Sequence, residues 1–180
     1  MRHSFFYFLE SGEIAFLEEK GFIIIFNEGS IFLPARVFNF LQKKLIETLG
    51  LEEASKILKL VGRFQADQAL KRYVKTLGIN SIEKEKIENF LLQIAEAIGI
   101  GKLEISKYEN NIIEVTTQMT VLSYEAKLEY GVQKHVWDYY VSGLVERAAE
   151  LLYNKKFNCE EIECYAKGDE RCSFVCKALE

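Results

Sequence analysis

Proline, methionine and histidine are scarce in this chain, and so are basic charge and long hydrophobic runs. Its 180 residues include one proline, two methionines, two histidines and one tryptophan, and the formal net charge is −4. Proteins that bind the phosphate backbone of nucleic acids need a basic face, and this composition argues against one. The longest apolar runs, such as 21–26, have the length of a strand and are too short to span a membrane.

Recognisable catalytic signatures are also missing. The sequence has no Gly-x-Gly-x-x-Gly dinucleotide loop, no phosphate-binding loop and no nucleophile with a base at a familiar spacing. A cleavable leader is not expected either, because Glu10 ends the apolar run 5–9 before it reaches the necessary length. We therefore expect a cytoplasmic protein that binds rather than catalyses.

Apolar and aromatic residues are abundant. They make up 49% and 13% of the chain, with 13 phenylalanines and 9 tyrosines, so one domain can bury a substantial core. A core rich in rings packs tightly or lines a pocket for a flat apolar ligand. The many Glu, Lys and Ile residues are typical of a thermophile, a setting in which intracellular disulfides occur.

The pattern of apolar residues predicts separate groups of strands and helices. The expected strands are 5–9, 13–17, 22–26, 30–33, 103–108, 112–117, 157–165 and 171–177. The expected helices are 34–49, 52–77, 80–98 and 132–153, with 123–129 either a loop or a short helix. Pro34 suits a first helical turn, and Asn80 with Glu83 matches a capping box. We predict an α+β fold, with an antiparallel sheet packed against helices.

All four cysteines lie close together near the C-terminal end. They are Cys159, Cys164, Cys172 and Cys176, and they surround a Gly-Asp turn rich in carboxylates. This grouping predicts a metal site, a disulfide staple or a redox pair. A reducing cytosol favours metal ligation, whereas buried free thiols are the simplest alternative.

The spacing around this turn favours zinc. Cys164 and Cys172 flank the turn of an expected hairpin, so facing strands can present both thiolates to one ion. Glu161 lies three residues before Cys164 and can add a carboxylate oxygen.

The segment resembles the end of the 4-vinyl reductase domain family, also called predicted hydrocarbon-binding proteins. The pattern is Glu161-x-x-Cys164-x-x-x-Gly168-Asp169-x-x-Cys172-x-Phe174. Upstream it is carried by Leu33-Pro34-Ala35, Leu49-Gly50-Leu51, Ile57-Leu58-x-x-x-Gly62, Gly99-Ile100-Gly101 and the helix-packing Gly143. The resemblance spans about residues 30–178. It implies a ligand-binding domain over 30–180, preceded by an added β-hairpin extension over 1–29.

This family is similar in fold to the sensor domains of phenol-responsive activators and to TRAPP vesicle-tethering subunits, which commonly dimerise. The resemblance therefore implies a homodimer. In the sensors, a helix cysteine joins the hairpin Glu and two Cys in holding zinc, and the corresponding helix position here is Asp138. The resemblance thus implies a structural zinc held by Asp138, Glu161, Cys164 and Cys172. His135, Cys159 and Cys176 are alternatives for the fourth ligand.

A ligand pocket is expected between the sheet and the helices. Candidate liners are the aromatics on the expected inward faces and one strand cysteine: Phe64, Tyr73, Phe90, Trp137, Tyr140 and Cys159. Aromatics at helical spacing also fit an ordinary core.

Three functions follow from these features. The first is a sensor or carrier for a small apolar or aromatic ligand, with output through a dimer surface or a regulatory protein partner. The second is a subunit of a reductase that acts on a tetrapyrrole vinyl group. The third is a TRAPP-like dimeric interaction module. We favour the first, because no catalytic signature supports the second.

Overall fold

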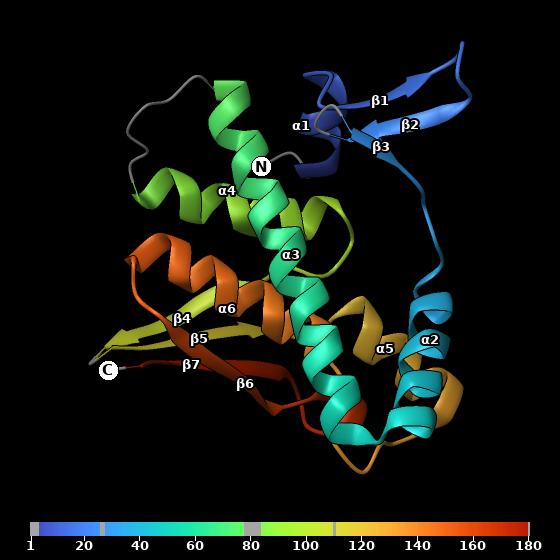
Figure 1. Ribbon diagram of the computed structural model, residues 1–180, viewed down its shortest axis with the longest axis vertical. Helices are drawn as coiled ribbons and strands as arrows, with labels where there is room; N and C mark the ends of the chain where they lie inside the picture. The colour runs from blue at the N-terminus through green and yellow to red at the C-terminus, as the bar shows by residue number, and fades with distance from the viewer. Residues whose placement is uncertain (1–3, 26–27, 78–83, 110, 180) are drawn as a thin grey trace.

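The computed structural model describes residues 4–25, 28–77, 84–109 and 111–179 (Figure 1). The helices are α1 (Ser4–Glu10), α2 (Ala35–Leu49), α3 (Leu51–Leu77), α4 (Lys84–Ala97), α5 (Val121–Tyr130), α6 (Tyr139–Tyr153) and the 3₁₀ turn η1 (Tyr165–Lys167). The strands are β1 (Ile14–Leu17), β2 (Phe22–Ile25), β3 (Glu28–Ser30), β4 (Glu104–Glu109), β5 (Ile112–Thr117), β6 (Phe157–Glu163) and β7 (Cys172–Ala178). The predicted α+β class is confirmed.

The N-terminal part contains a small antiparallel sheet in the order β1-β2-β3. The prediction of a strand over 5–9 is wrong, because these residues form α1. A short apolar run has no period that separates helix from strand, so packing decides. Here Phe8 is buried edge-on against Phe90 of α4, with ring centroids 6.3 Å apart. The predicted strand 30–33 is mostly an extended connection that runs from β3 to α2 (Figure 1).

The main sheet has the antiparallel order β4-β5-β7-β6. Alternate residues of β6 are buried, which is the pattern of a strand with one face on a core. The register places Cys172 opposite Thr117 of β5 and Cys176 opposite Cys159 of β6. Both predicted hairpins, β4–β5 and β6–β7, are therefore present. Figure 1 shows α6 along one face of this sheet, with α3 crossing over α6.

Helices α3 and α6 meet backbone to backbone. A Cβ atom at Gly62 would lie 2.0 Å from the carbonyl oxygen of Tyr140, and one at Gly143 would lie 2.1 Å from that of Lys59. Any side chain at either glycine would collide with the facing main chain, so the prediction that Gly143 packs helices is confirmed. This contact fixes the position of α6 and therefore of the residues before it.

Helices α5 and α6 clarify the prediction for the second half of the chain. Residues 123–129, whose sequence fits either a loop or a short helix, lie in α5, which begins with a capping box between Thr120 and Ser123. The prediction that a helix starts at 132 is wrong, because α6 starts at Tyr139 with Asp138 as its N-cap. The predicted capping box at Asn80 and Glu83 lies outside the described residues. Among the helices of the described ranges, none is both long and apolar enough to cross a lipid bilayer.

Candidate metal centre and ligand cavity

Four buried acidic side chains converge where α6 meets the β6–β7 hairpin. They are Asp138, Glu161, Cys164 and Cys172, and one potential ligand atom from each lies within 4.8 Å of the other three. Asp138 comes from the N-cap of α6, while the other three come from the end of β6, the residue before η1 and the start of β7. The structure thus brings together the four residues predicted from the sequence.

Main-chain groups hold these side chains in place. The N–H groups of Trp137 and Asp138 donate to Oε2 of Glu161, at 3.1 and 2.8 Å. The N–H of Trp137 also points at Sγ of Cys164, at 3.3 Å, and that of Tyr165 points at Sγ of Cys172, at 3.3 Å. N–H groups directed at sulfur and carboxylate ligands form the outer shell that orients such ligands in metal sites. Because α6 starts at Tyr139, the two preceding N–H groups are free to make these contacts.

A hydroxyl network supports Asp138. The Thr120 hydroxyl lies 2.8 Å from each carboxylate oxygen of Asp138. Ser123 lies next to both Thr120 and Cys172, with its Oγ 3.4 Å from the sulfur. Thr120 and Ser123 were not identified from the sequence. The Thr-x-x-Ser capping pattern at the start of α5 is the only signal that could have found them.

The protonation of the cluster reflects the burial of acids beside one another. Burial raises the pKa of Glu161 to about 8. Burial, together with the charges of Glu161 and Cys172, also raises the pKa of Asp138 well above its ordinary value. A hydrogen bond from Cys164 lowers the pKa of Cys172 to about 5, and the same contact raises the pKa of Cys164. The cluster therefore retains protons that a bound cation would displace.

The arrangement fits a zinc ion. Oε1 of Glu161 is buried and has no hydrogen-bond partner among the described residues. Cys164 and Cys172 are buried free thiols. With bonds of about 2.0–2.3 Å, ligands around tetrahedral zinc lie roughly 3.3–3.8 Å apart. The observed spread of 4.8 Å needs only small side-chain rotations to reach that geometry.

The alternative fourth ligands lie elsewhere. Cys159 and Cys176 are buried and joined by a disulfide across β6 and β7, so they are not the free core thiols that we expected. The direct pairing of these positions across the two strands brings the sulfurs together. His135 is half-buried, and its Nδ1 lies 2.9 Å from the carbonyl oxygen of Val136.

Two buried amides of α2 contact the segment next to the cluster. Nδ2 of Asn39 donates to the carbonyl of Leu122, and Oδ1 of Asn39 accepts the indole N–H of Trp137, at 3.0 Å. Nε2 of Gln42 donates to the carbonyl oxygen of Trp137, at 2.7 Å. These contacts were missed, because polar residues within a helix are usually exposed. They tie α2 to both ends of the loop that carries Asp138.

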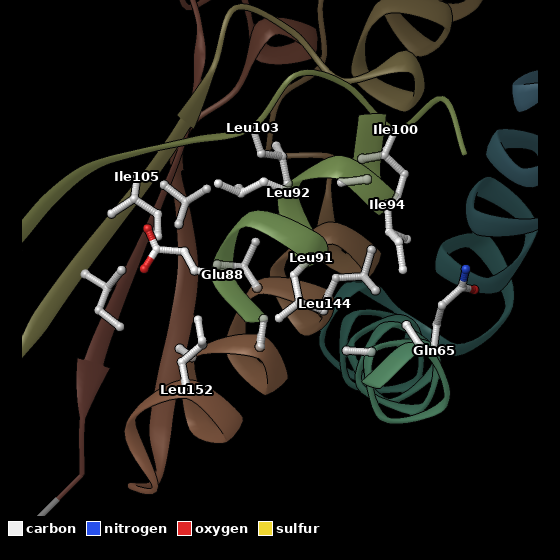
Figure 2. Close-up of a pocket in the computed structure, with 18 of the residues that line it drawn as sticks. Gln65, Glu88, Leu91, Leu92, Ile94, Ile100, Leu103, Ile105, Leu144 and Leu152 are labelled. Carbon is white, nitrogen blue, oxygen red and sulfur yellow. The ribbon is translucent and has the colours of Figure 1, made fainter. Parts of the chain in front are cut away.

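A separate apolar cavity of about 80 Å³ lies between α3, α4, α6, β4 and β5. Figure 2 shows aliphatic side chains pointing into it from several elements. Those that surround its centre include Leu91, Leu92, Ile94, Ile113, Val115 and Leu144. Its lining is almost wholly apolar, as in small-molecule sites, where a few polar groups fix the orientation of a ligand.

Five of the six predicted pocket residues lie outside this lining. Phe64 is 65% exposed on the outer side of α3. Phe90 contacts Phe8, and Tyr140 contacts Phe38, with ring centroids 5.1 Å apart in the second pair. Trp137 lies beside the acidic cluster, and Cys159 is in the disulfide. The side chain of the sixth, Tyr73, lies outside the described part of the chain. The described walls of this cavity are mainly aliphatic, not aromatic.

Comparison with known proteins confirms the resemblance found in the sequence. Residues 138–178 match the family model of the 4-vinyl reductase domain, and this segment contains all four residues of the acidic cluster. No match was found among curated proteins.

The fold itself occurs in solved structures. The chain is similar to the phenol-responsive sensory domain of the transcription activator PoxR, with a TM-score of 0.80 at 17% identity over 93% of this chain and 86% of that one. It is more distantly similar to a vinyl-4-reductase family protein from Methanocaldococcus jannaschii, with a TM-score of 0.42, 18% identity and coverage of 84% and 100%. A trafficking protein particle complex subunit 3 from Naegleria fowleri gives 0.48, 12%, 81% and 95%. The last two TM-scores are too low to support an argument about this chain. A 4-vinyl reductase domain match over residues 138–178 thus lies within a chain that has the fold of the PoxR sensory domain.

Proposed function

We propose that this protein is a ligand-sensing domain that binds a small apolar or aromatic molecule in the cavity beneath α4. The observation that carries the proposal is the cavity itself, with an almost entirely aliphatic lining in a fold shared with a phenol-responsive domain. An engineered aliphatic cavity of about 150 Å³ binds benzene. The cavity here is smaller, so a ring enters when α4 moves slightly away from the sheet.

The acidic cluster is proposed to hold a structural zinc. Four protein ligands close the coordination sphere, and a closed site leaves no open position for a substrate. Zinc would join the start of α6 to the β6–β7 hairpin. Its role is therefore to stabilise the binding domain, and the alternative of metal-assisted catalysis gains no support from this geometry.

A short connection links the cavity to the metal cluster. Ile100 lines the cavity, and its carbonyl oxygen accepts a 2.8 Å hydrogen bond from the N–H of Val121. The preceding residue, Thr120, contacts the carboxylate of Asp138. A ligand that displaces Ile100 would therefore act on the start of α5 and on the cluster. We propose this connection as the route by which occupancy of the cavity alters the rest of the domain.

A homodimer is proposed as the functional unit. The outer side of α3 exposes large apolar side chains at helical spacing, and these are Ile57, Leu60, Val61 and Phe64. An apolar face of this kind on a folded domain marks an interaction site more often than chance exposure. A second copy of the chain would cover it, because helices with matching stripes pack against each other.

The function is tested by following the melting temperature with toluene and with phenol. A rise that saturates with ligand is expected, because a ligand that binds only the folded state stabilises it. Ala95→Leu places a larger side chain in the cavity lining and should abolish the shift. Ala97→Leu changes the same helix outside the lining and should preserve it. The proposal fails if neither compound shifts the melting temperature of the unmodified protein.

A further inference from the structure

We propose that Glu88 makes the cavity selective for small apolar ligands that carry a hydrogen-bond donor, above all a protonated amine. This inference rests on the proposed function, since it concerns the ligand of the same cavity. It goes beyond that function because it specifies one polar group of the ligand and excludes another.

Glu88 differs from every other residue of the lining. It is the one carboxylate among residues that line the cavity in the described part of the chain, and it is half-buried. Figure 2 shows its carboxylate directed away from α4, beside Ile105 of β4. Within the described residues, no side chain forms an ion pair or hydrogen bond with it. A carboxylate at an aliphatic cavity therefore keeps its acceptor capacity for a ligand.

The other polar liners are arranged differently. Gln65 is exposed, and Figure 2 shows its amide turned away from the aliphatic side chains of the cavity. The ring of Tyr153 stacks on Tyr108, with centroids 4.5 Å apart, and meets Phe157 edge-on at 5.9 Å. Glu88 is thus the polar group best placed to read the chemistry of a bound molecule.

The chemistry of a carboxylate sets the preference. An ionised carboxylate only accepts hydrogen bonds, so a bound ligand must donate. A hydrogen bond between an ammonium and a carboxylate is about twice as strong as one between neutral groups, and an apolar surrounding strengthens it. Ligands with their own carboxylate would instead place like charges together. The expected order is amine, then alcohol or phenol, then hydrocarbon, with carboxylic acids excluded.

The test compares four ligands of nearly equal size: benzylamine, benzyl alcohol, toluene and benzoate. Dissociation constants are measured by calorimetry at pH 7 on the full chain purified with its metal. We expect benzylamine to bind at least tenfold more tightly than toluene, and benzoate to show no binding. Glu88→Gln should remove the tenfold preference while leaving toluene binding within a factor of three. Glu85→Gln, an exposed position on α4 outside the lining, is the matched control and should change neither.

The outcomes separate this inference from the proposed function. If toluene binds but benzylamine binds no more tightly, or if Glu88→Gln leaves the amine preference intact, the role of Glu88 is overturned and the cavity stands. Binding of benzoate as tight as that of benzylamine also overturns it. If none of the four ligands binds, the proposed function itself is contradicted.

Discussion

The main-chain N–H of Asp138 donates a 2.8 Å hydrogen bond to Glu161, and the two carboxylates belong to one buried cluster. The residue that starts α6 is therefore bound to the strand that leads into the C-terminal hairpin, 23 positions along the chain. A metal ion between the same residues would add a second connection at this point. The stability of the domain and its metal content should for this reason change together.

Replacing Glu161 tests this connection. Glu161→Gln keeps the shape of the side chain but removes a charged ligand, so the affinity for zinc should fall at least tenfold. The protein as purified should contain one zinc per chain, and the variant should contain less than a fifth of that after dialysis against a weak chelator. Elemental analysis of the purified protein measures both.

Glu163→Gln is the matched control for this replacement. Glu163 is two residues away on the same strand and pairs with Arg171, at 2.7 Å, outside the cluster. Its zinc content should equal that of the unmodified protein. Equal metal content in all three proteins, or none in any, would refute the zinc site.

The close contact between α3 and α6 predicts a severe effect at Gly143. Gly143→Ala would place a Cβ atom 2.1 Å from the carbonyl oxygen of Lys59. Because main chain cannot yield as a flexible side chain does, the helices must separate, at a cost of about 3 kcal/mol or more. Urea unfolding measures this loss. Ala97→Gly, an ordinary glycine effect in a helix, should cost only about 1 kcal/mol. A loss at Gly143 no larger than that of the control would show that the contact is looser than described.

A buried ion-pair network between α3 and α6 predicts sensitivity to acid. Burial raises the pKa of Glu150, but hydrogen bonds from Arg63 and Arg147, both 2.8 Å long, outweigh it and hold that pKa below the usual value. A carboxyl with a lowered folded pKa stabilises the fold above its unfolded pKa, and this contribution is lost as the pH falls through the folded value.

The corresponding variant is Glu150→Gln. At pH 7 it should lower the free energy of unfolding by about 1–3 kcal/mol, because it leaves two guanidinium groups without their partner. Below about pH 4.5, the ordinary pKa of a glutamate, the difference from the unmodified protein should shrink. Urea unfolding over the acidic to neutral range measures it, with exposed Glu170→Gln as control. A difference that stays constant over this range would contradict the assigned pKa shift.

The proposed dimer predicts a change of mass in solution. Phe64→Glu places a charge in the middle of the exposed apolar side of α3 and should convert dimers to monomers in sedimentation equilibrium. Leu179→Glu, a similarly exposed apolar position near the end of β7, should leave the dimer intact. A monomeric unmodified protein, or a Phe64→Glu variant that remains dimeric, would rule out this interface.

The fold and the cluster differ in how far the sequence predicts them. The hairpin with Glu161, Cys164 and Cys172 follows from local rules of turns and alternation, and Asp138 follows from a family resemblance. The apolar face predicted for α3 included Val61 and Phe64, yet the row that packs on α6 is Ala54, Leu58, Gly62 and Ala66. Close helix packing selects small residues, whereas hydrophobic periodicity gives most weight to large ones.

The cavity could not be predicted from the sequence. Its walls come from five elements, and its empty space depends on how far α4 stands from the sheet. Ile94 and Val115 have the same pattern as residues of a filled core, so periodicity cannot distinguish the two. The expectation of aromatic liners reflected composition, but the rings pair with one another elsewhere, as Phe8 does with Phe90.

The most direct test of ligand binding is a methyl NMR titration of the full chain with phenol. We predict saturable shifts for the cavity methyl groups of Ile94, Val115 and Leu144, followed by smaller shifts at the amides of Thr120 and Val121. The methyl groups of Leu128 and Leu179, both exposed, should not move. Cavity methyl groups that remain unchanged at millimolar phenol, or shifts confined to exposed positions, would contradict the proposal that this domain holds its ligand beneath α4.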